Sequence, residues 1–163
     1  MQTAGKDRPM TVQASGQPKE RRRAFTFTTS ARRIGDNVGT LASGEKNSLV
    51  VSSPPEFKGP PDLWSPEDMF VGALEMCHLL TFAAFARKRH VNVLSYASKA
   101  EGILEYAGGS YRFTRVIITP TIIVGDPAEA AIVRDVIEES HGHCLIANSV
   151  AASVEFNPVI LVQ

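Results

Sequence analysis

The stretch SPEDMFVGALEMCHLLTFAAFARKRH, residues 65–90, decides the fold of this chain. Ser65 suits the position before a first helical turn, and Pro66 suits the first helical position. Glu67 and Asp68 place negative charge at the positive end of the helix dipole. We therefore expect one long helix over these residues. Because its middle is apolar on nearly every side, one sheet cannot cover it, and the helix must be central or buried by a second chain.

The segments before this helix predict a small antiparallel sheet. Residues 25–28 alternate between apolar and polar side chains, and residues 48–51 form a short apolar run, with a turn signal at Asp36-Asn37-Val38-Gly39 between them. Five prolines and glycines between Pro54 and Pro61 then impose a stiff loop that a helix cannot cross.

The segments after the helix predict a hairpin, a second helix and a last strand. Residues 91–105 and 111–124 surround a Gly-Gly turn, and Pro120 indicates a bulge or an edge in the second strand. Residues 127–139 are typical of a helix, which we expect His141-Gly142-His143 to break, followed by a short helix from Cys144. Residues 150–161 predict the last strand, with an edge at Pro158. The fold class is therefore α+β.

Composition limits the classes of function. With 163 residues the chain is long enough for one domain with a real core, and we expect a flexible leader over residues 1–23 and a folded domain over residues 24–163. Lys plus Arg equals Asp plus Glu at 17 each, so no overall charge favours nucleic acid or an anionic membrane. The start of the chain has no apolar signal segment, and the later apolar segments look too short to span a membrane. We expect a soluble, cytoplasmic protein.

Cys77 and Cys144 are the two cysteines of the chain, so any thiol chemistry must use this pair. In a reducing compartment a reversible dithiol is catalytic or redox-sensing rather than structural. The alternative is a pair of inert thiols in the core, since buried free cysteines usually serve packing.

The chain resembles the OsmC/Ohr family of thiol-dependent peroxidases. The residues that carry the resemblance are Ser65-Pro66-Glu67-Asp68-Met69-Phe70, Ala73-Leu74-Glu75-Met76-Cys77-His78 and Cys144-Leu145-Ile146-Ala147-Asn148-Ser149, with weaker support from residues 97–105. The similarity spans roughly residues 24–160. It implies an OsmC-like fold, with antiparallel sheets around a long central helix, in an intertwined homodimer whose active sites lie at the subunit interface.

The same resemblance implies a chemistry. Cys77 would be the peroxidatic thiolate that reduces an organic hydroperoxide to an alcohol and becomes a sulfenic acid, and Cys144 would be the resolving thiol that closes a disulfide. The implied reductant is a dithiol such as dihydrolipoamide, and no cofactor or metal is implied. Neither a nucleic acid nor a membrane is expected as a partner.

Two further site residues come from the resemblance. Glu67 matches a glutamate that holds an arginine over the reactive thiol. It lies ten residues from Cys77, about 15 Å along one helix, so it would serve the cysteine of a partner subunit. The arginine would be Arg33 or Arg32. A glutamate in the first helical turn is also explained by its favourable interaction with the helix dipole alone.

Other functions stay open. His78, His141 and His143 near two cysteines invite a metal site, but they lack the paired spacings of structural zinc sites. A hydrolase could use Cys77 with His78 or His143 and would not need Cys144. A non-catalytic redox sensor or ligand-binding dimer would keep the dithiol without turnover. Aromatic side chains around the helix suit either the core or an apolar substrate pocket, namely Trp64, Phe70, Phe82 and Phe85.

Overall fold

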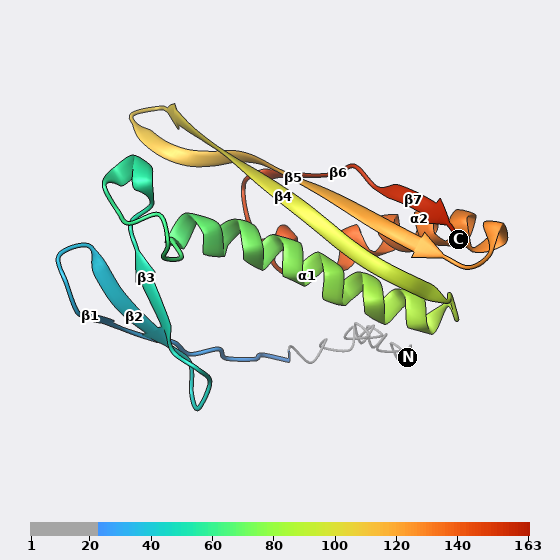
Figure 1. The fold of residues 1–163 in the computed structure, drawn as a ribbon, viewed down its shortest axis with the longest axis horizontal. Helices are drawn as coiled ribbons and strands as arrows, with labels where there is room; N and C mark the ends of the chain where they lie inside the picture. Colours follow the sequence, from blue (N-terminus) through green and yellow to red (C-terminus); the bar gives the residue numbers. More distant parts are fainter. Residues whose placement is uncertain (1–22) are drawn as a thin grey trace, which may run out of the picture.

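The computed structural model describes residues 23–163, so the predicted leader lies, except for Arg23, outside the described residues. The described part is a four-stranded sheet covered on one face by two helices, with a small three-stranded sheet beside the start of the first helix (Figure 1). The elements in chain order are β1 (Ser30–Arg33), β2 (Val38–Ala42), β3 (Leu49–Ser52), η1 (Pro55–Phe57), α1 (Pro66–Lys88), β4 (Val93–Ala107), β5 (Ser110–Val124), α2 (Pro127–His143), η2 (Ala147–Ser149), β6 (Ser153–Phe156) and β7 (Val159–Val162). This arrangement confirms the predicted α+β class.

α1 begins as the sequence predicts. Ser65 is the N-cap: its hydroxyl accepts from the backbone N–H of Asp68 at 3.0 Å, and the Asp68 carboxylate accepts from the backbone N–H of Ser65 at 2.9 Å. This reciprocal pair satisfies two donors that the first turn leaves unpaired. Arg87 and Lys88 in the last turn complement the negative end of the dipole.

The large sheet is built on the hairpin of β4 and β5. The two strands pair antiparallel along their whole length, from Val93 opposite Val124 to Ala107 opposite Ser110. β6 and β7 both pair with β5 in parallel, so this sheet is mixed rather than purely antiparallel as predicted. The parallel pairing follows from α2, which carries the chain back along the sheet after β5 and so returns it in the same direction.

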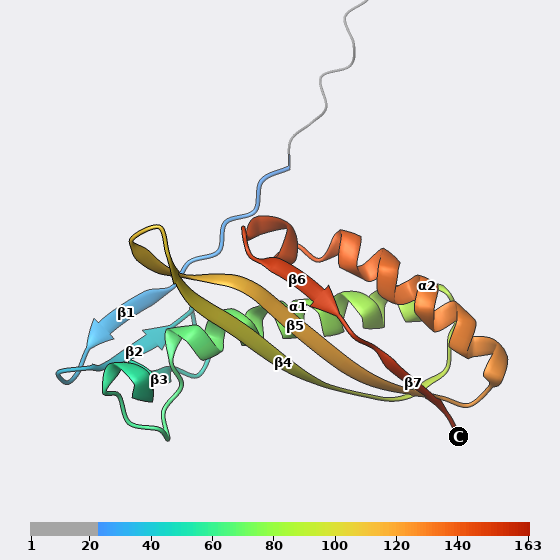
Figure 2. The ribbon, with the colours of Figure 1, turned by 90° about the horizontal axis from the view of Figure 1, so that it is seen from above.

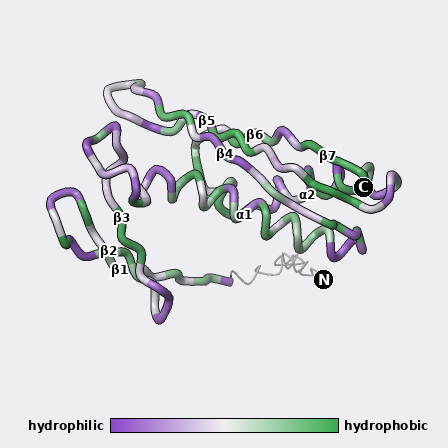
Figure 3. Tube along the Cα trace, in the orientation of Figure 1, coloured by the Kyte–Doolittle hydropathy of each residue, from purple (hydrophilic) through white to green (hydrophobic). Residues whose placement is uncertain are grey.

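Both helices pack against the same face of this sheet (Figure 2). Alternate side chains of β5 point toward them, and one buried cluster joins the two helices to the far half of the strand: Phe82, Ala86, Ile122, Val124, Val133, Val136 and Ile137. A second cluster lies under the first half of α1 and consists of Leu74, Val116 and Ile118. The tube in Figure 3 is green along stretches of α1, β5 and β7. The sheet thereby fixes α1 and α2 side by side.

α1 remains only half covered in the single chain. Its buried stripe is Leu74, His78, Phe82 and Ala86, whereas the opposite side exposes Met76 at 51% and Leu80 at 61% together with Ala73, Ala83 and Ala84. The expectation that one sheet cannot cover this helix is confirmed. An apolar strip of this kind is typical of a surface that another chain buries.

α1 also passes a test for membrane helices by length and composition. The helix has 23 residues and is apolar enough over 18 of them to cross a membrane. The expectation that every apolar segment is too short for a span was therefore wrong. Core helices pass the same test, and α1 buries one stripe of its side chains against the sheet.

The predictions for the ends of the chain need three corrections. Residues 25–28 form no strand, since Phe25 and Phe27 are exposed and the first pairing begins at Ser30. Residues 141–143 do not break α2, which runs through His143 and ends on Cys144 as its C-cap. The predicted last strand is two strands, β6 and β7, separated at Asn157 and Pro158.

Pro120 lies neither at a bulge nor at an edge. It is buried in β5 and pairs with Ser98 in regular register. It is tolerated because the parallel ladder is interrupted beside it: the pairing with β6 ends at Ile118, and the pairing with β7 begins at Thr121. A residue without an N–H fits at this gap.

We predict that Gly102→Ala destabilises the fold. A Cβ at this position of β4 would lie 2.4 Å from Cγ2 of Val71 and 2.8 Å from the ring of Phe113. Overpacking of this kind typically costs about 1–3 kcal/mol, measurable as a lower midpoint of chemical unfolding. Gly142→Ala in α2 is the matched control, because nothing lies within 4 Å of its Cβ, and it should leave stability equal or higher. Equal midpoints for Gly102→Ala and the unaltered protein would contradict this packing.

Candidate functional site

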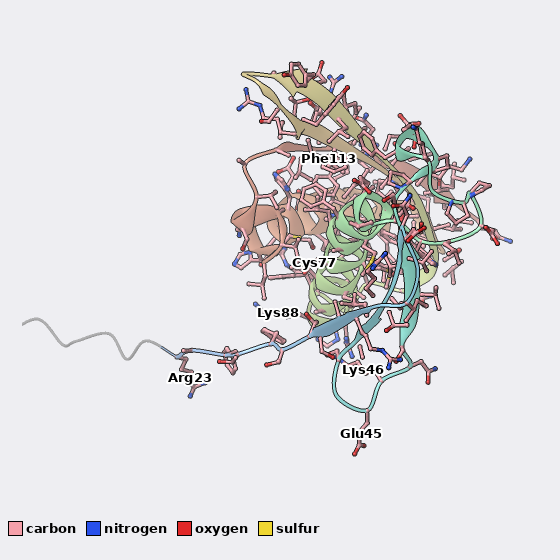
Figure 4. All side chains as sticks on the ribbon, turned by 90° about the vertical axis from the view of Figure 1, so that its left-hand side faces the viewer. Arg23, Glu45, Lys46, Cys77, Lys88 and Phe113 are labelled. Carbon is pink, nitrogen blue, oxygen red and sulfur yellow. The ribbon has the colours of Figure 1, made fainter. Side chains whose placement is uncertain are left out.

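The two cysteines meet between α1 and the end of α2. Cys77 lies near the middle of α1 (Figure 4), and Cys144 caps α2 at the point where the chain turns into η2. Cys144 is fully buried, Cys77 is partly exposed, and their side chains hydrogen-bond to each other. The pairing of two cysteines 67 positions apart in the sequence is the central feature of the site.

The surroundings of Cys77 favour its thiolate. Burial raises the pKa of its thiol, but hydrogen bonds from the backbone N–H of Ile146, the thiol of Cys144, the backbone N–H of Leu145 and the side chain of Thr81 together lower it below its ordinary value. Each of these donors stabilises a negative sulfur. The group that activates the thiol within this chain is therefore the backbone of the turn after α2.

Cys144 has the opposite tendency. Burial raises the pKa of its thiol, and the neighbouring Cys77 raises it further, which outweighs backbone hydrogen bonds from Ala147 and Ile146. Two thiols in contact do not ionise together, because the first negative charge opposes the second. The pair thus consists of a thiolate at Cys77 and a thiol at Cys144 that donates to it.

The position of Cys144 follows from the local sequence. α2 ends where the backbone turns extended at Cys144. Asn148 donates to the carbonyl oxygen of Gly142 in the last turn of α2 at 3.0 Å, and Ser149 donates to the carbonyl oxygen of Leu145, just after the helix, at 2.7 Å. The Asn-Ser pair of the resemblance therefore shapes the turn whose N–H groups reach Cys77.

His78 points away from the thiol pair and into the core. It is fully buried on the sheet side of α1, and its Nδ1 lies 3.1 Å from the hydroxyl of Tyr96. Its ring lies 4.0 Å from the ring of Phe156, and its Nε2 is buried without a partner. Burial, and secondarily the nearby His141, lowers the pKa of His78 to about 4. A neutral His78 that makes no contact with Cys77 is not its general base.

Glu67 lies in the first turn of α1, away from the thiol pair of its own chain. It lines a cleft of about 970 Å³ between α1, the loop before it and the β4–β5 hairpin. Its Oε2 is buried and has no hydrogen-bond partner. The cleft is strongly acidic, since the described residues that line it include no Lys or Arg and five carboxylates, namely Glu56, Asp62, Glu67, Asp68 and Glu75. A buried carboxylate oxygen of this kind needs a hydrogen-bond donor, and none of the described residues supplies one.

The two candidate arginines lie in the small sheet. Arg33 ends β1 and forms an exposed ion pair with Asp36 at 2.9 Å, and Arg32 is also exposed. Neither belongs to the groups that shift the pKa of Cys77 within the chain. Their role at a partner's site stays a prediction.

The other histidines occupy separate positions. His141 lies edge-on against Phe156 at 4.8 Å. Nδ1–H of His143 donates to the carbonyl oxygen of Glu139 at 2.8 Å, and its ring lies beside Phe85. In the part of the chain that the structure describes, no three His, Cys, Asp or Glu side chains converge as metal ligands. Of the four aromatic candidates, Phe82 is core and Phe85 packs against the same core cluster. Phe70 stacks on Phe113, and Trp64 is exposed at the acidic cleft.

Sequence reasoning missed the donors that activate Cys77. Leu145 and Ile146 act through backbone N–H groups, which no side-chain pattern identifies. Thr81 lies four residues after Cys77 on the same face of the helix, a spacing from which it could have been identified. Its hydroxyl donates to the carbonyl oxygen of Cys77 at 2.8 Å.

Comparisons with known proteins agree with this fold. The model of the OsmC-like protein family matches residues 59–159. The uncharacterized protein YmaD of Bacillus subtilis is 24% identical over 123 residues, which are 74% of this chain and 81% of YmaD.

Solved structures show the same architecture. An OsmC-like protein of unknown function from Vibrio cholerae matches with a TM-score of 0.77 and 23% identity, covering 83% of this chain and all of that one. An organic hydroperoxide resistance protein from Elizabethkingia anophelis matches with a TM-score of 0.68 and 18% identity, covering 86% of this chain and 99% of that one. At these identities the two matches establish the fold.

We predict that His78 makes stability depend on pH between about 4 and 6.5. The unfolded chain binds a proton at His78 near pH 6.5, whereas the folded chain binds it only near pH 4. The contribution is therefore fully present above pH 6.5 and is lost as the pH falls toward 4. It amounts to about 3 kcal/mol at most. Chemical unfolding measured across this range should show the slope, and His78→Asn should flatten it.

His90→Asn is the control for this measurement. His90 lies just beyond α1, is exposed, and has a left-handed backbone with φ of 56°, which asparagine tolerates. It should keep the slope of the unaltered protein. A slope that survives His78→Asn would show that another group carries the pH dependence.

Proposed function

This chain belongs to the OsmC-like protein family, and we propose that it reduces organic hydroperoxides to alcohols through Cys77 and Cys144. The observation that carries the proposal is the thiol pair itself: the backbone N–H groups of Ile146 and Leu145 and the thiol of Cys144 favour the thiolate of Cys77. Inert core thiols would need no such set of donors. The organic hydroperoxide resistance protein with the same fold supports the choice of substrate class.

In the proposed first step the Cys77 thiolate attacks the terminal oxygen of the hydroperoxide. An S–O bond forms and the O–O bond breaks, so the alkoxide leaves with the electron pair of that bond. The alkoxide takes up a proton and becomes the alcohol, and Cys77 becomes a sulfenic acid. The thiol of Cys144, which donates to the Cys77 sulfur, supplies this proton in the proposed step.

In the second step Cys144, now a thiolate, attacks the sulfenic sulfur of Cys77. The S–S bond forms, the S–O bond breaks, and hydroxide leaves as water after protonation. The pKa of Cys144 is raised mainly by its burial, and the loss of the Cys77 negative charge removes one obstacle to its ionisation. Each thiol shifts the pKa of the other, so the two side chains are neighbours before the disulfide forms.

A dithiol restores the pair. Its first thiol opens the disulfide to a mixed disulfide, and its second thiol displaces the protein, which leaves two protein thiols and one oxidised reductant. The sum is one hydroperoxide and one dithiol converted into alcohol, water and a disulfide of the reductant. We propose a compound such as dihydrolipoamide in this role, and a cytoplasmic location is its natural setting.

We also propose that the active unit is a homodimer. Two observations support it: the exposed apolar strip of α1, which includes Met76 and Leu80, and the unpaired buried oxygen of Glu67 in an acidic cleft without Lys or Arg among its described lining residues. A second copy would bury the strip. It would also bring Arg32 or Arg33 of one subunit to Glu67, so that the arginine and Glu67 serve a cysteine across the interface.

The geometry disfavours a hydrolase that pairs Cys77 with a histidine. Nδ1 of His78 is taken by Tyr96, Nδ1 of His143 is taken by the carbonyl of Glu139, and neither ring hydrogen-bonds to Cys77. A redox sensor would use the same thiol pair without turnover, and a turnover assay separates it from a peroxidase.

We predict that Cys77→Ser abolishes reduction of cumene hydroperoxide with dihydrolipoamide, because a serine hydroxyl is not an effective nucleophile here. Cys144→Ser should keep the first step, and dimedone should trap one sulfenic acid per chain. The unaltered protein should consume two thiols per chain and form an internal disulfide, measured by thiol titration and mass spectrometry. Undiminished turnover in Cys77→Ser would sink the assignment, and stoichiometric oxidation without turnover would favour the sensor.

We predict a dimer of about 35 kDa, twice the chain mass of 17.7 kDa, in light scattering at micromolar concentration. Leu80→Glu should shift the protein toward monomer, because it places a charge in the exposed apolar strip of α1. Ala131→Glu, an exposed small residue on α2, is the matched control and should stay dimeric. A folded monomer for the unaltered chain would refute both the dimer and the shared site.

A further inference from the structure

Two polar cross-links tie α1 to β4 directly behind the thiol pair. Ser98 donates to the carboxylate of Glu75 at 2.6 Å, and Tyr96 meets Nδ1 of His78 at 3.1 Å. The four residues match in spacing: Glu75 and His78 lie three apart on one face of the helix, and Tyr96 and Ser98 lie two apart on one face of the strand. The two cross-links fix the register between helix and strand.

The two cross-links lie side by side in a partly buried part of the fold, with His78 itself fully buried. Burial raises the pKa of Tyr96 to about 12, so the phenol stays neutral. The ring of Tyr96 packs on Phe82 at 5.2 Å within the main core cluster. Polar groups in such a place are costly to leave unpaired, so the whole group favours a single arrangement.

His78 extends this group to the other side of the site. Its ring lies 4.0 Å from Phe156 of β6, and Phe156 lies 4.8 Å from His141, three residues before Cys144. His78 is thus bonded to β4 on one side and packed through Phe156 toward the end of α2 on the other. No other described residue of α1 makes both connections.

We propose that His78, held by Tyr96 beside the Ser98–Glu75 bond, is a positioning residue that sets Cys77 against the backbone N–H groups of Leu145 and Ile146. His78 directly follows Cys77 in α1, so a rotation or shift of its turn displaces the sulfur as well. Hydrogen bonds to a thiolate weaken steeply with distance and angle, so a small displacement reduces its stabilisation. This inference rests on the proposed function in one respect, that Cys77 is the reacting thiol.

Two matched substitutions remove the Tyr96–His78 bond from either end. Tyr96→Phe deletes only the hydroxyl and keeps the ring on Phe82, while His78→Phe deletes both nitrogens and keeps an aromatic ring beside Phe156. His78→Asn retains an amide near the position of Nδ1 and tests for rescue. Asp126→Ala is the stability control, because it removes the N-cap of α2, whose carboxylate accepts from Ala128 at 2.7 Å, at the opposite end of that helix.

The pKa of Cys77 is read from the pH dependence of its alkylation by iodoacetamide, in a Cys144→Ser background. The rate of disulfide closure after one equivalent of oxidant is read in the background that retains Cys144. We expect Tyr96→Phe and His78→Phe to raise the pKa of Cys77 by about one unit and to slow closure about tenfold, with His78→Asn near the unaltered values. Asp126→Ala should lower only the unfolding midpoint.

The proposal is overturned if Tyr96→Phe lowers stability as Asp126→Ala does while the pKa of Cys77 and the closure rate stay unchanged. Tyr96→Phe decides the matter even where His78→Phe fails to fold, because it removes a single oxygen. Neither readout requires turnover. An inactive unaltered protein would therefore count against the peroxidase and leave the test of His78 intact.

Discussion

A helix that is apolar on nearly all sides must be covered on all of them, and the rest of this structure follows from that requirement. The stripe from Leu74 to Ala86 is buried on the sheet, and α2 lies beside it. The opposite side, with Met76 and Leu80, is left exposed in the single chain. Cys77 lies between the covered and the uncovered side, which keeps it partly accessible while its sulfur contacts the end of α2.

The contact of Cys77 with the turn after α2 favours the thiolate form of this cysteine. Burial by itself raises a thiol pKa, so an apolar helix is a poor place for a nucleophile. Here backbone N–H groups of Leu145 and Ile146, together with the Cys144 thiol, outweigh the burial. The site thus needs no positive charge from its own chain to favour the thiolate. An arginine from a partner subunit would add to this effect rather than supply all of it.

The sequence predicts those parts of the structure that show a hydrophobic periodicity or a signal for the end of a helix or strand. The capping box at Ser65 and Asp68, the hairpin of β4 and β5 and the start of α2 at Asp126 follow from local sequence, because neighbouring residues determine them. The parallel pairing of β6 and β7 and the gap beside Pro120 do not, because they depend on which strands meet in space. Likewise Cys77 and Cys144 were identifiable as residues, whereas the donors at Leu145 and Ile146 are backbone groups that carry no sequence signature.

The most direct test of this account is the ionisation of Cys77 in the reduced protein, followed by the ultraviolet absorbance of the thiolate as the pH is raised. With Cys144→Ser to remove the second thiol, the account predicts one thiolate per chain that forms clearly below the ordinary thiol pKa of about 8.5. The signal should disappear in a Cys77→Ser, Cys144→Ser double variant. A Cys77 that ionises at or above the ordinary value would show that burial outweighs the backbone donors, and the activated thiol on which the account depends would not exist.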